Sequence, residues 1–183
     1  MDDAFGFSDD QDPRFPERVP LFRLWRTPAL VPLLHLQREV GPGDVEHFYT
    51  ASPEERDEAI RHHRYVLAGV ACLVHGRPAA GSVPLFRLWH APTRHHAFTT
   101  DPANVSAARA LGTFHYDGVA AYVFPNPVSS AGTVPLHALV HRARYAHLYT
   151  TDEAERDAAV AAGAEALGIA CWVYPAEAHR DGG

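Results

Sequence analysis

Val83-Pro-Leu-Phe-Arg-Leu88 is a string of strand-forming residues that the chain carries in two further versions. These are Val31-Pro-Leu-Leu-His-Leu36 and Val134-Pro-Leu-His-Ala-Leu139, so the three strings begin 52 and 51 residues apart. In each of them proline stands at the second position, where a strand can begin without its missing N–H group. The nearly constant spacing indicates an internal repeat of about fifty residues.

Two further landmarks follow each of these strings in the same order. The first is a histidine, any residue, an aromatic residue and a threonine, found at His47–Thr50, His96–Thr99 and His147–Thr150. The second is a glycine followed by three small or apolar residues, found at Gly69–Cys72, Gly118–Ala121 and Gly168–Cys171. We therefore predict three repeats, which cover residues 31–82, 83–133 and 134–175.

Each repeat is expected to contain a strand, a second strand, a helix and a hairpin. Ser52 and Pro53 are typical of a helix start, as N-cap and first helical residue, and Asp152 caps the third repeat's helix. Asp117-Gly118 lies between two runs of β-forming residues and favours the tight turn of a hairpin. The predicted fold class is α+β and mostly β, with three strand-strand-helix-hairpin repeats in a closed, pseudo-threefold, propeller-like arrangement.

The three repeats are expected to share a single domain over residues 19–175. Val19-Pro-Leu-Phe-Arg-Leu-Trp25 copies the first strand of the second repeat and predicts an extra N-terminal strand over residues 19–25. Residues 1–18 and 176–183 are polar or rich in turn-forming residues, so we expect both segments to be loose.

The composition bounds the function. Of the 183 residues, 46% are hydrophobic and 21% are charged, as in a folded globular protein. The net charge of -6 argues against nucleic-acid binding, which needs a basic surface. We expect no membrane span, because no apolar run approaches the roughly 18–20 residues that cross a bilayer. The acidic N-terminus lacks the basic and apolar regions of a secretory signal.

The two cysteines, Cys72 and Cys171, stand at matching places in the first and third repeats, where the second repeat has Ala121. Two thiols are too few for a disulfide framework. We interpret both as small residues of a buried strand, with a single bridge between them as the alternative.

These strings resemble a family of uncharacterised bacterial and fungal repeat domains over residues 31–175. The family consensus runs approximately V-P-L-Y-R-L-Y-N-P, then D-H-F-Y-T-T, then E-R-D and finally E-G-I-A-Y-V-Y. The resemblance implies an extracellular or surface-associated module, often appended to hydrolases, that binds cell-wall or glycan material. The chain departs from the consensus at Asn104–Ser106 in the second repeat and at His137-Ala138 in the third.

Three histidines at matching positions, His47, His96 and His147, are candidate site residues. One interpretation is that each holds a strand-to-helix turn by hydrogen bonds, and a second is that each contacts a ligand. A third is that they converge on the axis of the ring and bind one metal ion. Their neighbours are an aromatic residue and a threonine rather than metal-binding residues at ligand spacing, so we predict no metal and no cofactor.

Aromatic residues and Arg-Asp pairs complete the predicted binding sites. Rigid rings stack on the apolar face of a sugar, and planar charged side chains bind its hydroxyl groups. The candidate rings are Tyr49, Trp89, Phe98 and Tyr149, and the candidate hydrogen-bonding residues are Arg56, Asp57, Arg156 and Asp157. The alternative is that the rings pack in the core and the Arg-Asp pairs lie on solvated helix faces.

The sequence carries no recognisable catalytic motif, since G-x-S-x-G, the P-loop and G-x-G-x-x-G are all missing. Repeated, equivalent sites suit multivalent binding better than catalysis. We therefore predict a non-enzymatic, lectin-like protein that binds carbohydrate or cell-wall polysaccharide through up to three related pockets. A protein-interaction scaffold with one exposed apolar patch is the first alternative, and a hydrolase-type enzyme is the second. The ligand, the compartment and the oligomeric state stay open.

Overall fold

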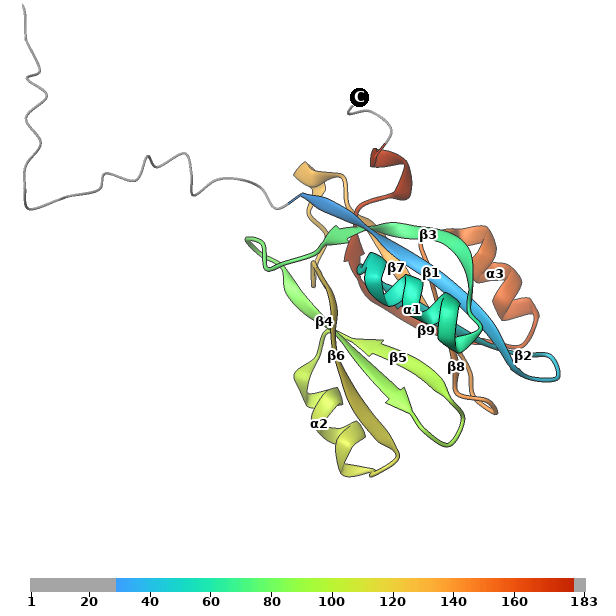
Figure 1. Ribbon diagram of the computed structural model, residues 1–183. Helices are drawn as coiled ribbons and strands as arrows, with labels where there is room; N and C mark the ends of the chain where they lie inside the picture. Colours follow the sequence, from blue (N-terminus) through green and yellow to red (C-terminus); the bar gives the residue numbers. More distant parts are fainter. Residues whose placement is uncertain (1–28, 180–183) are drawn as a thin grey trace, which may run out of the picture.

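The computed structural model describes residues 29–179 (Figure 1). Within this range, the strands and α-helices are β1 (Leu30–Gly41), β2 (Asp44–Thr50), α1 (Pro53–His63), β3 (Val66–His75), β4 (Val83–His90), β5 (His95–Thr99), α2 (Pro102–Ala110), β6 (Phe114–Val123), β7 (Val134–His141), β8 (Ala146–Thr150), α3 (Glu153–Ala161) and β9 (Glu165–Val173). Two short 3-10 helices, η2 (Ser129–Ala131) and η3 (Ala176–His179), follow β6 and β9. The order strand, strand, helix, strand therefore occurs three times, and we call residues 30–75, 83–123 and 134–173 the first, second and third units.

Each unit forms three antiparallel strands with its first strand in the centre. The strands form a six-stranded sheet in the order β2-β1-β3-β6-β4-β5 and a three-stranded sheet in the order β8-β7-β9. Within the six-stranded sheet, β3 and β6 pair only at His75 and Tyr122. Two isolated bridges, Leu73 with Tyr174 and Phe124 with Trp172, connect the third unit to the other two. Backbone pairing between units is thus concentrated at one end of the strands.

The predicted arrangement is wrong. The structure is mostly β, but its strands form two antiparallel sheets, neither of which is a closed, propeller-like ring. The predicted hairpin is also missing, because Asp117-Gly118 lies inside the continuous strand β6. Gly118 has a φ of 101° there, next to a shift in the register between β4 and β6. A glycine with positive φ serves a β-bulge as well as a two-residue turn, so the sequence pattern did not separate the two.

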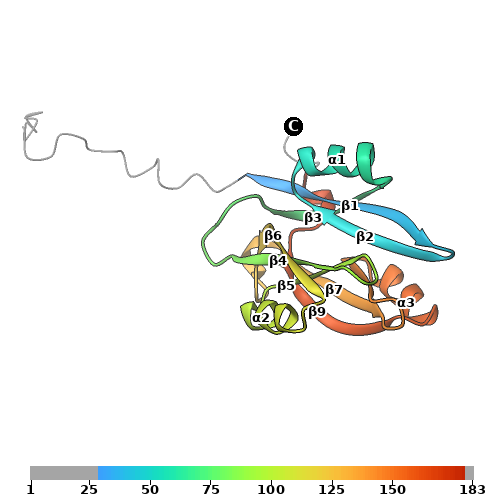
Figure 2. The same ribbon diagram turned by 60° about the horizontal axis from the view of Figure 1, so that its bottom comes forward.

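Helices α1 and α3 begin at the residues that the capping pattern predicted. The Ser52 hydroxyl accepts a hydrogen bond from the Glu55 N–H at 3.1 Å, and Pro53 is the first residue of α1. The Asp101 and Asp152 carboxylates cap α2 and α3 in the same way. Figure 2 shows α1 above β1 and β2, with α2 and α3 on the opposite side of the molecule. No helix in residues 29–179 is long and apolar enough to cross a membrane.

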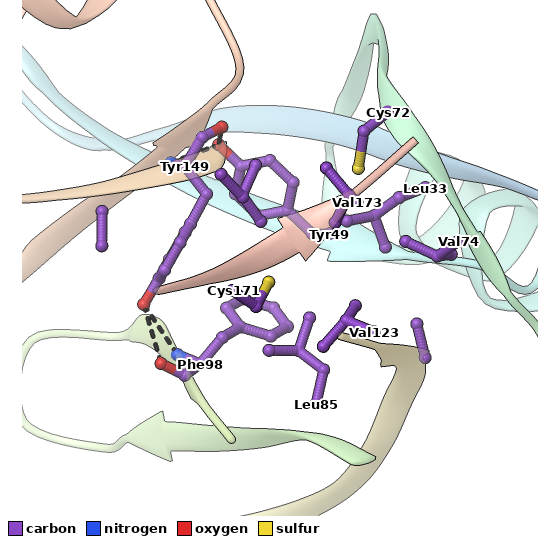
Figure 3. Packing of buried hydrophobic residues seen from close by; sticks show 13 residues of the cluster. Leu33, Tyr49, Cys72, Val74, Leu85, Phe98, Val123, Tyr149, Cys171 and Val173 are labelled. Carbon is purple, nitrogen blue, oxygen red and sulfur yellow. Dashed lines mark hydrogen bonds between the residues drawn. The ribbon is translucent and has the colours of Figure 1, made fainter. Parts of the chain in front are cut away.

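The core lies where the three units meet, and each unit contributes to it. Three aromatic rings at its centre, Tyr49, Phe98 and Tyr149, contact one another edge-on with centroids 5.3–5.7 Å apart. The Tyr49 hydroxyl donates to the Tyr149 carbonyl at 3.0 Å and accepts from the Tyr149 N–H at 3.0 Å. The Tyr149 hydroxyl bonds the Phe98 backbone in the same two ways (Figure 3). These rings therefore hold one unit to the next through the backbone.

Cys72 and Cys171 are free thiols in the same core. They are 0% and 1% exposed. Burial raises the pKa of the Cys72 thiol well above its usual range and that of Cys171 to about 12. The interpretation of both as buried strand residues is confirmed.

The ends of the chain leave two sequence predictions without a structural comparison. The loose segment 1–18 and the extra strand 19–25 lie outside the described residues. Of the predicted C-terminal tail, residues 176–179 form η3, and residues 180–183 are not described.

Candidate functional site

A cavity of about 630 Å³ lies between the first and second units, and we call it the interunit cavity. Its walls come from β1, β2 and α1 on one side and from β4, β5 and β6 on the other. The first unit contributes Arg38, Phe48, Glu54, Glu55, Glu58, Ala59 and His63, together with Tyr65 just before β3, and the second contributes Arg87, Trp89, His96, His115 and Asp117.

Arg87 is the central charge of this cavity. It lies within β4, and its side chain is only 7% exposed. Its two terminal nitrogens bond the two carboxylate oxygens of Glu55 at 2.8 and 3.0 Å, and its Nε bonds Asp117 Oδ2 at 2.7 Å. The bidentate contact fixes the plane of the Glu55 carboxylate, because both parallel N–H groups must be met. One residue of the second unit thus fixes the first turn of α1.

The same contacts keep both carboxylates ionised. The hydrogen bonds from Arg87 lower the pKa of Glu55. For Asp117, the hydrogen bond to His96 lowers the pKa most, and the charge of Arg87 adds to it. Each of the two carboxylate side chains is 43% exposed.

A second charged group lies beneath the cavity. Glu46 of β2 is fully buried, and its carboxylate contacts Arg38 Nε at 2.7 Å and His96 Nδ1 at 2.6 Å. Burial raises the pKa of Glu46, but the hydrogen bonds and charges of His96, Tyr65 and Arg38 together hold the pKa below its usual value. Because an ionised carboxylate only accepts, His96 donates from Nδ1. Its Nε2 lies 3.6 Å from Asp117 Oδ2, so His96 connects the two charged groups.

Aromatic rings form another part of the cavity wall. The His96 ring lies between Trp89 and Phe48, with centroid distances of 4.7 and 5.0 Å. Phe48 also packs against Tyr65 at 5.5 Å, and the guanidinium of Arg87 lies over the Phe48 ring at 4.9 Å. Cation–π contacts of this kind are favourable when water is excluded. The cavity therefore combines ring surfaces with charged groups fixed in position.

Two of the predicted site residues, Trp89 and His96, line this cavity. The structure places three of the others in the core, where Tyr49, Tyr149 and Phe98 are 1%, 4% and 8% exposed. Their positions fit the packing interpretation given above.

The other two matching histidines lie elsewhere. His47 Nδ1 lies 2.9 Å from His35 Nε2, and His147 Nδ1 bonds the Tyr145 carbonyl at 2.8 Å. Burial lowers the pKa of both His47 and His147 to about 4, so both are neutral at pH 7. Across residues 29–179, no group of three His, Cys, Asp or Glu side chains is arranged to hold a metal ion.

The two predicted Arg-Asp pairs are local ion pairs on helices. Arg56 bonds Asp57 on α1, and Arg156 bonds Asp157 on α3, each through its own neighbour in the sequence. None of the four residues lines the interunit cavity. This placement fits the solvated helix face that was the alternative.

Several cavity residues were absent from the predicted site. These are Arg38, Glu55, Tyr65, Arg87 and Asp117, and Glu46 beneath the cavity was absent as well. One signal was visible in the sequence, since Arg87 stands among Leu85, Phe86 and Leu88 in a string that predicts a strand. A charged residue within a buried strand needs a partner, and that requirement indicates a charged site.

The fold and cavity define a mostly β protein with a charged, aromatic-walled pocket between two units. Residues 35–174 match the family described as a domain of unknown function, DUF5648, and the chain belongs to that family. The expected resemblance to an uncharacterised domain is confirmed at this level. No curated protein and no solved structure matches the chain.

Proposed function

We propose that this protein is a non-enzymatic, lectin-like module that binds carbohydrate, such as cell-wall polysaccharide, in the interunit cavity. The observation that carries the proposal is the position of the Arg87–Glu55–Asp117 group in the same cavity wall as Trp89. A saccharide ring offers one apolar face and a rim of hydroxyl groups, and the cavity supplies a partner for each.

The size of the cavity suits a small saccharide. Ligand pockets have volumes of roughly 300–1,000 Å³. The 630 Å³ of the interunit cavity lie within that range, and the Trp89 ring is partly exposed in its wall. A rigid ring that is already in place loses little conformational entropy when a ligand stacks on it.

The carboxylates supply the hydrogen-bond acceptors. Glu55 and Asp117 are held by Arg87, so their oxygens are oriented before a ligand arrives. Groups that are positioned in advance bind without a further ordering cost. A carboxylate has about four acceptor sites, so one that already bonds Arg87 can also accept a hydrogen bond from a sugar hydroxyl.

The protonation states support binding rather than hydrolysis. Glycoside hydrolysis needs a carboxylic acid that keeps its proton near neutral pH. The pKa values of Glu46, Glu55 and Asp117 are all lowered, so these three carboxyl groups are ionised there. None of the three is suited to donate that proton.

A protein-interaction scaffold is the second candidate function, because β3 exposes apolar side chains. Val66, Leu67 and Val70 are 58%, 47% and 46% exposed. Exposed apolar surface of this kind is typical of interaction sites. This function predicts that Val66→Ser and Val70→Ser abolish binding to a protein partner and leave saccharide binding unchanged.

A glycan array followed by calorimetry tests the proposal. Trp89→Ala is expected to weaken binding of the best saccharide about tenfold, the loss typical of one aromatic contact. Tyr116→Ala is the matched control, because Tyr116 is 44% exposed on β6 but outside the cavity lining. No binding above background on a broad array, or equal binding by wild type and Trp89→Ala, would overturn the proposal.

A further inference from the structure

We infer that the interunit cavity prefers a saccharide with a free, protonated amino group over a neutral or an acidic one. The inference rests on the proposed carbohydrate binding and specifies its ligand class. It follows from the charges that line the cavity and from how those charges are already paired.

The two arginines of the lining are already neutralised. Arg38 pairs with Glu46, and Arg87 faces both Glu55 and Asp117. An acidic ligand would therefore meet guanidinium groups whose charge is already balanced by carboxylates. Within the described lining, the positive charges therefore give an acidic sugar no favourable site.

Helix α1 adds two further carboxylates to the same lining, those of Glu54 and Glu58. Glu54 accepts a hydrogen bond from the Ser52 hydroxyl, and Glu58 is 3.8 Å from His62 Nε2 and 59% exposed. The lining then holds four carboxylates against two guanidinium groups. These Arg, Glu and Asp side chains together carry a net negative charge, and such a field attracts cations.

The aromatic wall adds a second attraction for a cation. An ammonium group gains electrostatic energy over an indole face. Trp89 is partly exposed, and Asp117 lines the same cavity. The cavity therefore offers a protonated amino group both an aromatic ring and a carboxylate. N-acetylation removes that charge and both gains.

The test compares three tetrasaccharides by calorimetry: β-1,4-linked glucosamine, its fully N-acetylated counterpart and α-1,4-linked galacturonate. The glucosamine tetramer is expected to bind at least tenfold more tightly than the N-acetylated one, with galacturonate the weakest. The preference should shrink as salt is added, because salt screens charges near the surface.

Charge-removing variants locate the effect. Glu54→Gln combined with Glu58→Gln should reduce the preference for glucosamine about threefold or more, and leave binding of the N-acetylated tetramer unchanged. Glu153→Gln is the matched control, because Glu153 is a 74% exposed carboxylate at the start of α3, outside the cavity. This control should keep the full preference.

The possible outcomes distinguish the preference for an amino group from carbohydrate binding itself. Equal or tighter binding of the N-acetylated tetramer overturns the amino-group preference and leaves carbohydrate binding standing. An unchanged preference in the double variant also overturns the inference, because the carboxylates of α1 would then have no part in it. Absence of binding to all three tetramers overturns the inference and counts against the proposed function as well.

Discussion

The interunit cavity has a smaller, apolar counterpart in the third unit, and the two differ in a few side chains. The counterpart has a volume of about 160 Å³ and is lined mostly by Leu, Val and Ala side chains. His47 reaches it from the first unit, just as His96 of the second unit reaches the interunit cavity. Where β2 carries Glu46 and Phe48 before and after its histidine, β8 carries Ala146 and Leu148.

The comparison shows what turns a junction between units into a site. His96 meets the carboxylates of Glu46 and Asp117, whereas His47 meets another histidine, His35. The backbone order is the same at both junctions, so the difference in chemistry comes from the side chains. Similar backbone therefore carries a charged pocket at one junction and an apolar one at the other.

Removing the central charge is expected to have the largest effect. Arg87→Ala should lower the free energy of unfolding by about 3 kcal/mol, because two carboxylates would lose the cation that holds them together. Urea denaturation measures the change. The exposed ion pair on α3 is the control, and Arg156→Ala should show no measurable change. Equal losses in both variants would mean that the charged junction does not differ from a surface ion pair.

Acid should lower the free energy of unfolding through His47, which contacts His35. His47 has a pKa of about 4 in the folded chain against an ordinary 6.5, so the unfolded chain takes up its proton first. The contribution of neutral His47 to the free energy of unfolding is therefore fully present above pH 6.5. It falls by about 2–3 kcal/mol as the pH drops towards 4.

The His47→Gln variant should lose the pH dependence of the free energy of unfolding that this histidine causes. Urea denaturation at pH 7, 6, 5 and 4 measures it, with His62→Gln on the exposed end of α1 as the control. A curve for His47→Gln that falls as steeply as that of wild type would show that protonation of His47 is not coupled to unfolding.

The Tyr149 hydroxyl in the core should contribute less to the free energy of unfolding than Arg87 or His47. Tyr149→Phe removes the hydroxyl that bonds the Phe98 N–H and carbonyl, and should cost about 1–2 kcal/mol, because both backbone groups stay buried. Thermal denaturation checks it. Tyr116→Phe removes a hydroxyl from an exposed ring and should leave the melting temperature unchanged. A loss as large for Tyr116→Phe as for Tyr149→Phe would rule out a special role for the core hydroxyl.

Local features were predictable from the sequence because they depend on neighbouring residues. Ser52 and Pro53 marked the start of α1, and the matching strings marked the strands that hold Trp89 and His96. Contacts between units were not predictable in this way. Arg87 and Glu55 are 32 residues apart, and His96 and Glu46 are 50 residues apart. Sequence periodicity does not fix how two units pack, and that packing decides which charges meet.

The backbone bridges between units also bear on motion. They lie at Leu73, His75, Tyr122, Phe124, Trp172 and Tyr174, all near one end of the strands. Away from these bridges, the walls that hold Arg87 and Glu55 are joined by side-chain contacts and not by a β-ladder. Hydrogen exchange should be slowest at the bridged amides, because those amides exchange only when the contact between units opens.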